Sequence, residues 1–381
     1  MPQITVRPYE EKDREAFFHV RAMTFNDGRP IPVEDQVFKT TRGFLAEIEN
    51  QIAGVFVILD FTCTRGRATL RDAAVAGVAV LPEFRMSGVG GAMMKWALKH
   101  FREEGIPMAS LYAFRESYYR NFGYEVCGSR VKTTLPNSRY PKIKPELPIR
   151  RLNLDEIAAI KPCYDAFCHQ RSGMNIRTDN HWSRVLGKDI SIYAAGDPVE
   201  AYILVNHQWQ FWEGQSVSEF VWTSRRGYDA IVSVLCGIGI NKTSVDWYEP
   251  SDSPYLYRYE DQGVKHQIER LVMYRATDVK ACLEALKPDH SGTFSITIQD
   301  DLIPENRGPW RVEFSPNSVK VAPTESGEIE IPIRHFVQAL LGEPSLADLA
   351  RNDLINVKSL KAMQAAELLL PPNPTYCTDF F

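Results

Sequence analysis

The sequence predicts an α+β protein built from more than one domain. Its 381 residues are too many for one ordinary hydrophobic core, since a domain usually holds about 100 to 200 residues. Hydrophobic residues make up 44% of the chain and charged residues 24%, which is the composition of an ordinary globular protein. Strand-like and helix-like patterns follow one another along the chain. These observations favour several units that each combine strands and helices.

The first part of the chain predicts an antiparallel sheet with a helix after its first strand. The stretch ITVRPY alternates as a strand does, and residues 11–25 carry apolar side chains at helical spacing. In FLAEIENQIAGVFVILDF, the polar Glu49-Asn50-Gln51 separates two apolar runs and so predicts a hairpin. The following ATLRDAAVAGVAVL predicts another strand.

A longer helix is predicted directly after that strand. Its apolar residues share one helical face, and they are Val89, Met93, Met94, Ala97, Leu98 and Phe101. The helix ends at Gly105-Ile106-Pro107, and MASLYAF predicts the next strand.

Proline-rich segments divide the rest of the chain. Prolines cluster between Leu135 and Pro148, which predicts a linker. The stretch IRRLNLDEIAAI then resembles the early RPYEEKDREAF, so the pattern favours a duplicated unit. A third unit begins near Arg275, and the chain closes on LLLPPNPTYCTDFF. Because prolines stiffen this tail and its last residues are apolar, we expect it to dock on the protein.

Charge and hydropathy exclude several classes of function. The 44 basic and 48 acidic residues give a net charge of -4, which offers no electrostatic footprint for nucleic acid or an anionic membrane. The start MPQITVRPYEEKDRE lacks the features of a signal peptide, and no run of about 18 apolar residues occurs. We therefore expect a cytoplasmic protein with neither nucleic acid nor a membrane as partner.

The cysteines do not predict a metal site or a disulfide framework. There are 7 of them, they are scattered, and the only cluster is Cys163, Cys168 and His169, which lacks a second half at zinc spacing. We expect no metal, and we interpret the cluster as one face of a helix.

A glycine-rich loop joins the strand Val78-Ala79-Val80 to the predicted helix. The loop reads Arg85, Met86, Ser87, Gly88, Val89, Gly90 and Gly91. Glycines before a helix expose backbone N–H groups, which with the helix dipole favour an anion such as phosphate. Neither the P-loop nor the dinucleotide-binding pattern fits, because no lysine with Ser or Thr follows and Met93 stands where the third glycine belongs. A purely structural glycine turn remains an alternative.

This loop resembles the R-x-x-G-x-G/A loop of the GCN5-related N-acetyltransferase (GNAT) family. A second stretch, Tyr118 to Tyr124, resembles the family's F-Y-x-x-x-G-F/Y motif. The resemblance implies acetyl-CoA as cosubstrate, held by the strand and loop residues Val78, Ala79, Val80, Arg85, Met86, Ser87, Gly88, Val89, Gly90 and Gly91. It also places Tyr119 as general acid, although a packed aromatic side chain is the alternative for this residue.

The whole chain resembles one branch of that family, the Eis (enhanced intracellular survival) acetyltransferases. The resemblance rests on two acetyltransferase-like units, a sterol-carrier-like third unit with PWRVEF and IPIRHFVQALLG, and a terminal phenylalanine. It implies two tandem GNAT-like mixed-sheet domains at residues 1–140 and 141–284, the second without a cofactor loop, and a sterol-carrier-protein-like α+β domain at 285–381. It also implies a hexamer.

The same resemblance implies a mechanism. The acceptor is a primary amine of a small molecule, with aminoglycosides among the candidates, or of a lysine. It attacks acetyl-CoA directly, with the α-carboxylate of Phe381 as base and Asp27 near the acceptor. The chain departs from the mycobacterial pattern at Ala113–Ser117 and at Phe380, and both changes narrow or de-acidify the expected pocket.

A function of another class stays open. The third unit could bind a lipid or a partner protein, with the acetyltransferase-like fold as its scaffold. The complete loop together with Tyr119 favours the enzyme.

Overall fold

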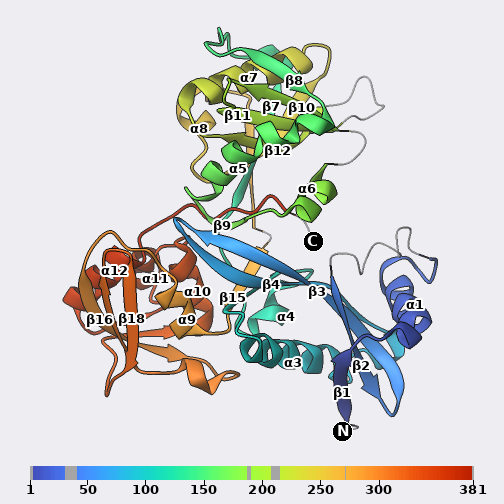
Figure 1. The fold of residues 1–381 in the computed structure, drawn as a ribbon, viewed down its shortest axis with the longest axis vertical. Coiled ribbons are helices and arrows are strands. Elements are labelled where there is room, and N and C mark those ends of the chain that lie inside the picture. The colour runs from blue at the N-terminus through green and yellow to red at the C-terminus, as the bar shows by residue number, and fades with distance from the viewer. Residues whose placement is uncertain (1–2, 31–40, 187–189, 207–214, 271, 380–381) are drawn as a thin grey trace.

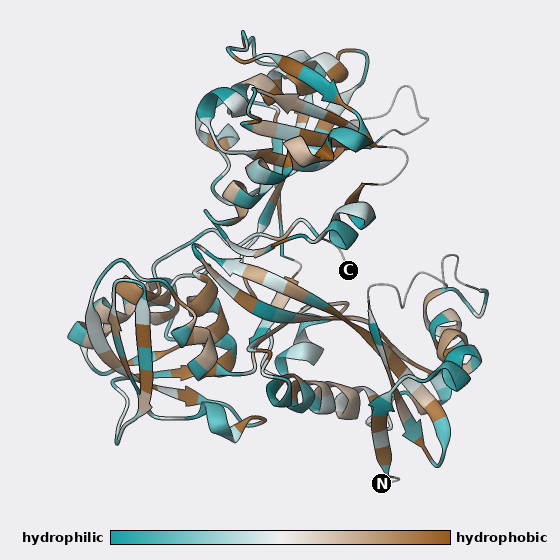
Figure 2. Ribbon diagram, viewed as in Figure 1, coloured by the Kyte–Doolittle hydropathy of each residue, from teal (hydrophilic) through white to brown (hydrophobic). Residues whose placement is uncertain are grey.

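The computed structural model describes residues 3–30, 41–186, 190–206, 215–270 and 272–379. These residues form three lobes (Figure 1), and their strands belong to an eight-stranded, a seven-stranded and a five-stranded sheet. Figure 2 shows hydrophobic residues gathered in the strands of each lobe and hydrophilic ones on outward helix faces. The expected α+β class is confirmed. Among the described helices, none combines the length and apolar character needed to cross a membrane.

The first sheet has the order β1-β2-β3-β4-β5-β15-β6, with β9 added to β3. Its strands are β1 (Ile4–Pro8), β2 (Arg42–Ile48), β3 (Gln51–Arg65), β4 (Ala68–Val80), β5 (Met108–Tyr112), β6 (Glu125–Val126), β9 (Ser172–Asn175) and β15 (Val272–Ala276). The predicted hairpin is confirmed: Glu49 and Asn50 both have positive φ, the backbone that a two-residue turn between twisted strands requires.

The described helices of this lobe are α1 (Arg14–Phe25), α3 (Val89–Glu103) and α4 (Glu116–Arg120). All six residues of the predicted apolar face of α3 are buried. Alternate residues of β2 and β3 pack against different helices. Phe44 and Phe56 lie in the cluster of α3, whereas Leu45 and Val55 lie in that of α1. The two helices therefore cover opposite faces of the sheet.

The second sheet has the order β14-β7-β13-β12-β11-β10-β8. Its strands are β7 (Arg130–Pro136), β8 (Ile149–Leu152), β10 (Ile190–Ala195), β11 (Ala201–Asn206), β12 (Gln215–Trp222), β13 (Ser244–Pro250) and β14 (Lys265–Glu269). Its helices are α5 (Lys161–Cys168), α6 (Asp179–Val185), α7 (Arg225–Ile238) and α8 (Tyr255–Arg258). Cys163 and Cys168 are both buried in this lobe's core, so the prediction of a helix face is confirmed for the two cysteines, whereas His169 is exposed just after the end of α5.

The first sheet takes two strands, β9 and β15, from the second stretch of sequence, and the second sheet takes β7 from the first stretch. β7 precedes residue 140 but pairs with β13 and β14 of the second sheet. β15 precedes residue 284 but lies between β5 and β6 of the first sheet. Sheet membership therefore crosses the expected boundaries, and the two lobes are tied together by backbone hydrogen bonds.

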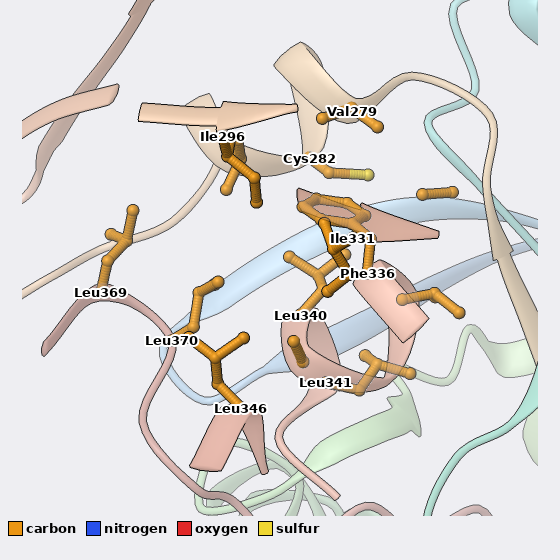
Figure 3. Close-up of a cluster of buried hydrophobic side chains, with 14 of the residues drawn as sticks. Val279, Cys282, Ile296, Ile331, Phe336, Leu340, Leu341, Leu346, Leu369 and Leu370 are labelled. Atoms are coloured by element: carbon orange, nitrogen blue, oxygen red, sulfur yellow. The ribbon is translucent and has the colours of Figure 1, made fainter. Parts of the chain in front are cut away.

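The third lobe has a sheet of order β18-β17-β16-β19-β20. Its elements are β16 (Gly292–Gln299), β17 (Trp310–Ser315), β18 (Ser318–Pro323), β19 (Ile329–Pro332), β20 (Asn356–Val357), α9 (Val279–Glu284), α10 (Ile333–Leu341), α11 (Leu346–Arg351) and α12 (Leu360–Leu369). Figure 3 shows Phe336, Leu340 and Ile331 facing Cys282 and Ile296 across this core. The same cluster continues into the first lobe through residues such as Leu70 and Met108.

After α12 the tail leaves the third lobe and runs between the other two (Figure 1). The amide of Tyr376 donates to the carbonyl of Ser172 at 2.9 Å, and that of Ser172 donates to Pro374 at 2.9 Å. Gly128 has a φ of +73°, and a Cβ there would stand 2.0 Å from the carbonyl oxygen of Thr375. The tail is therefore docked as far as Asp379.

A buried ionic triad fixes the end of the described tail. The Nε of Arg177 donates to Asp379 at 2.8 Å, and its guanidinium also donates to Glu219 at 3.1 Å. The side chain of Arg177 is 1% exposed and that of Glu219 is 2% exposed. Asn175 donates to Asp379 at 3.2 Å and Tyr202 donates to Glu219 at 2.6 Å, so both carboxylates have further donors.

We predict that Arg177→Met lowers the free energy of unfolding by about 3–5 kcal/mol, because it leaves two buried carboxylates without their cation. Urea denaturation measures this change. The control is Arg226→Met, which removes the exposed ion pair with Glu200 and should cost less than about 1 kcal/mol. Equal, small losses in the two variants would contradict the anchoring role of Arg177.

Candidate active site

Two neighbouring parallel strands of the first sheet separate and leave a gap. Residues Asp72–Val75 of β4 pair with Met108–Leu111 of β5. β4 then continues to Val80, while β5 ends at Tyr112. Beyond Val75, β4 keeps β3 on one side and has no described strand on the other. The free edge presents backbone N–H and C=O groups that need partners, which a bound molecule can supply.

A bulge in β4 lies at the start of this gap. The pairing of β3 with β4 jumps between Val57↔Ala76 and Val55↔Ala79. Gly77 has a φ of +58°, and a Cβ there would stand 2.5 Å from Nη1 of Arg21. Such a bulge bends the strand and redirects the side chains that follow it. Val78 and Val80 accordingly point into the gap as lining residues.

The glycine loop carries the chain from β4 into α3. Met86 has a φ of 66°, and Gly88, the N-cap of α3, has a φ of 94°. The Nε of Arg85 donates to Val80 at 3.2 Å, and the hydroxyl of Ser87 donates to Phe84 at 2.6 Å. Since Gly88 has no side chain to cap the helix, the first N–H groups of α3 remain available to an anion.

The gap and the loop form one cleft of about 900 Å³, a size typical of ligand sites. Its described lining residues include Arg85 and Arg115, and none of the described ones is acidic. No carboxylate partner of either arginine is found among the described residues. The lining residues are Thr24, Phe25, Val78, Val80, Phe84, Arg85, Met86, Gly88, Val89, Gly90, Gly91, Phe114, Arg115, Ser117, Tyr118 and Asn121. Positive charge and helix N–H groups together favour a polyanionic ligand such as coenzyme A.

The two tyrosines of α4 occupy different positions. Tyr118 lines the cleft, and its hydroxyl would stand 2.5 Å from a Cβ at Gly90. Tyr119 is only 3% exposed, and its ring packs edge-on against those of Phe114 and Tyr124 at 5.7 and 6.3 Å. Burial raises the pKa of both phenols above its ordinary value. Tyr119 is therefore buried next to a lining residue and is not itself one of the described lining residues.

The structure brings most of the predicted cofactor residues together. Those that line the cleft are Val78, Val80, Arg85, Met86, Gly88, Val89, Gly90 and Gly91. Ala79 does not, because its side chain is buried in the cluster of α1. Ser87 does not, because its hydroxyl turns back to Phe84. Asp27 follows α1 with a φ of 50° and is not a lining residue. Phe381 lies outside the described residues.

Sequence reasoning missed part of the wall. Thr24 and Phe25 come from the end of α1, and Ser117, Tyr118 and Asn121 come from α4 and its end. Tyr118 had one available signal, since it directly precedes Tyr119 in the second motif. Thr24 and Phe25 had none, because only the folded sheet brings the end of α1 to the loop.

Gly90 and Gly91 offer a matched pair for testing the cleft. We predict that Gly90→Ala raises the Kd for coenzyme A about tenfold or more, because its Cβ meets the Tyr118 hydroxyl. Gly91→Ala is the control, since its Cβ would have only Phe122 nearby at 3.8 Å. Calorimetry measures both. Adding Tyr118→Phe to Gly90→Ala should restore binding, and failure of this rescue would contradict the assigned contact.

The comparisons with known proteins agree with this geometry. Residues 5–127 match the family model described as acetyltransferase (GNAT) domain, and residues 279–378 match the model of the sterol carrier protein domain. No curated protein matches the sequence.

Solved structures match over the whole chain. A protein of Enterococcus faecalis V583, described as a probable N-acyltransferase, has a TM-score of 0.89 at 18% identity and covers 100% of both chains. A GCN5-related N-acetyltransferase of Anabaena variabilis has a TM-score of 0.88 at 18% identity and also covers 100% of both chains. Eis1 of Mycobacterium abscessus has a TM-score of 0.81 at 21% identity, and the match covers 99% of this chain and 100% of the Eis1 chain.

At these identities the structures establish the fold. The fold is the expected one, two tandem GNAT-like domains followed by a sterol-carrier-like domain. The match of residues 5–127 adds the family of the domain that carries the cleft. The N-terminal domain is therefore a GNAT acetyltransferase domain, for which acetyl-CoA is the cosubstrate, and the chain is an enzyme of the acyltransferase class.

Proposed function

We propose that this chain transfers an acetyl group from acetyl-CoA to a primary amine of a small molecule or a lysine. The observation that carries the proposal is the cleft between β4 and β5, where the Arg85–Gly91 loop meets a wall that holds Arg115 and no acid. The loop donors and arginines suit the phosphates, and the gap beside Val78 suits an extended chain. When bound, acetyl-CoA supplies an activated thioester.

The residues of the chain supply position and protons. A neutral amine attacks the carbonyl carbon, and the C–N bond forms as the C–S bond breaks. The N–H group of Val78 or Val80 on the free edge of β4 stabilises the oxyanion. Tyr119 donates its proton to the departing thiolate, and the amine's proton passes to the base. Asp27, near the end of α1, is proposed to approach the acceptor.

We predict that Tyr119→Phe lowers kcat about 10²–10⁴-fold, because the thiolate loses its acid. Tyr118→Phe is the matched variant, and it should act mainly on the KM for acetyl-CoA because Tyr118 lines the cleft. Steady-state release of coenzyme A measures both. A large loss of kcat in Tyr118→Phe, with only the KM for acetyl-CoA changed in Tyr119→Phe, would contradict this assignment and make Tyr118 the general acid.

The pH profile gives a second readout of the same variants. Burial raises the pKa of Tyr119 above its ordinary value, so the phenol keeps its proton at neutral and mildly alkaline pH. Ionisation of Tyr119 should therefore not lower the wild-type rate at any pH below about 10. A decline that begins below this pH and disappears in Tyr119→Phe would contradict the raised pKa.

The α-carboxylate of Phe381 is the proposed base. The support is the path of the tail: the carbonyl of Asp379 accepts a hydrogen bond from the hydroxyl of Tyr112 at 2.8 Å. Tyr112 is the last residue of β5, the strand whose end opens the cleft. An α-carboxylate has an ordinary pKa of about 3.5, so it acts through water or by orienting an amine that is already neutral.

Two variants separate the carboxylate from the side chain of Phe381. Two glycines added after Phe381 turn its α-carboxylate into a neutral amide and move the terminal negative charge two residues further on. We expect kcat to fall about 100-fold or more while acetyl-CoA binding persists. Phe381→Ala keeps a terminal carboxylate and should retain more activity. Full activity of the extended chain would contradict this base.

We further propose the Eis-type division of labour. Residues 1–140 form the catalytic domain, 141–284 a GNAT-like domain without a cofactor loop, and 285–381 the sterol-carrier-like domain that delivers the tail. Coverage of the whole chain by the fold of Eis1 supports this division. From the same resemblance we propose that the protein is a cytoplasmic hexamer. The packed interior of the third lobe (Figure 3) favours a structural role over lipid binding there.

A further inference from the structure

A second cavity, of about 280 Å³, lies where the first lobe, the second lobe and the tail meet. Phe61 of β3 forms one side, the α6 residues His181 and Arg184 form another, and Glu219 and Asp379 close it toward the tail. None of these residues belongs to the first cleft. The inference drawn from this cavity rests on the proposed acetyltransferase function.

The second cavity borders the strands whose separation forms the first cleft. Phe61 pairs with Asp72 of β4, shortly before the point at Val75 where β4 leaves β5. Asp379 lines the cavity with its side chain, while its carbonyl accepts from Tyr112 at the end of β5. A molecule in this cavity therefore lies beside the end of the described tail, and the tail in turn contacts the end of β5.

Both carboxylates of this cavity already accept hydrogen bonds from buried donors of the protein. Arg177 donates to both Glu219 and Asp379, and the side chains of these acids are only 2% and 10% exposed. Tyr202 and Asn175 occupy further carboxylate oxygens. A polycationic acceptor would find no free carboxylate on this wall, and it would have to compete with a buried arginine.

Among the described lining residues, the charged side chain that is exposed is a cation. Arg184 is exposed on α6, and no carboxylate pairs with it in the part of the chain that the structure describes. His181 packs edge-on against Phe61, with ring centroids 4.8 Å apart. Burial lowers the pKa of His181 below its ordinary value, so the ring is neutral at pH 7. Val185 and Ile190 add apolar surface.

We propose that this cavity binds the acceptor and selects a primary amine on an aromatic or apolar body that also carries a carboxylate. The carboxylate pairs with Arg184, whose planar guanidinium matches its geometry. The aromatic body packs on Phe61 and His181, and the amine points toward the gap between β4 and β5. Acetylation then forms the amide C–N bond and breaks the C–S bond, and the amine's proton leaves with the base while Tyr119 protonates the thiolate.

Three benzylamines that differ only in the para substituent test the proposal. They are 4-(aminomethyl)benzoate, 4-(aminomethyl)benzamide and 1,4-bis(aminomethyl)benzene, each assayed for release of coenzyme A. The expected kcat/KM for the carboxylate is at least about tenfold above that for the diamine. In Arg184→Gln the ratio of carboxylate to amide should fall about tenfold. The control is Arg225→Gln, at an arginine that is 70% exposed and 3.8 Å from Glu146, which should keep the ratio.

Binding of the acetylated products tests the same inference without turnover. Calorimetry with coenzyme A present compares 4-(acetamidomethyl)benzoate with the analogue that carries a para ammonium group. Tighter binding of the carboxylate that weakens in Arg184→Gln supports the proposal. Equal binding, preference for the cation, or no binding of the carboxylate overturns it. Loss of acetyl-CoA turnover with every amine, by contrast, would count against the proposed function and leaves this binding test decisive for the cavity.

Discussion

The buried Arg177 guanidinium is the interaction on which the arrangement of the three lobes around the site depends. Its partners come from β12 of the second lobe and from the tail, which starts in the third lobe. Taking these charges out of water is costly, and only their mutual pairing and the extra donors offset that cost. The triad therefore stabilises this position of the tail, because here the Asp379 carboxylate accepts from both the Arg177 guanidinium and the Asn175 amide. The proposed base follows Asp379 by two residues, so the anchor also positions the chemistry.

Local pattern and non-local pairing explain which parts of the fold the sequence could predict. The face of α3 and the hairpin at Glu49-Asn50 follow from helical spacing and turn residues within a few positions of one another. The exchange of β7 and β15 leaves no such signal, because each strand reads as an ordinary alternating segment and its partners lie far away in sequence. The linker is expected to begin at Leu135, but it begins only after Pro136, because Leu135 and Pro136 still belong to β7 and pair with β13.

The candidate site divides in the same way. The loop from Arg85 to Gly91 could be predicted because its function is a property of consecutive residues, namely glycine backbones before a helix. Ala79 and Ser87 do not line the cleft, and the reasons are equally local. The side chain of Ala79 points to the opposite face of β4 from its neighbours Val78 and Val80. The hydroxyl of Ser87 donates to the carbonyl of Phe84 in the turn. The opposite wall and the second cavity could not be predicted, since they combine α1, α4, α6, β3 and the tail. The charge balance of each cavity depends on such neighbours.

The second lobe shows why one GNAT-like unit carries the cleft and the other does not. In both units a helix connects two parallel strands, α3 between β4 and β5 and α7 between β12 and β13. α3 starts at the bare Gly88, whereas Ser224 caps α7 by accepting from the amide of Gly227 at 3.0 Å. Glu200 then accepts from the Ser224 hydroxyl at 2.5 Å and pairs with Arg226. A carboxylate at that helix start repels phosphate. The start of α7 is thus occupied by side chains of its own unit, and this unit also supplies Arg177 to the triad and the α6 residues to the second cavity.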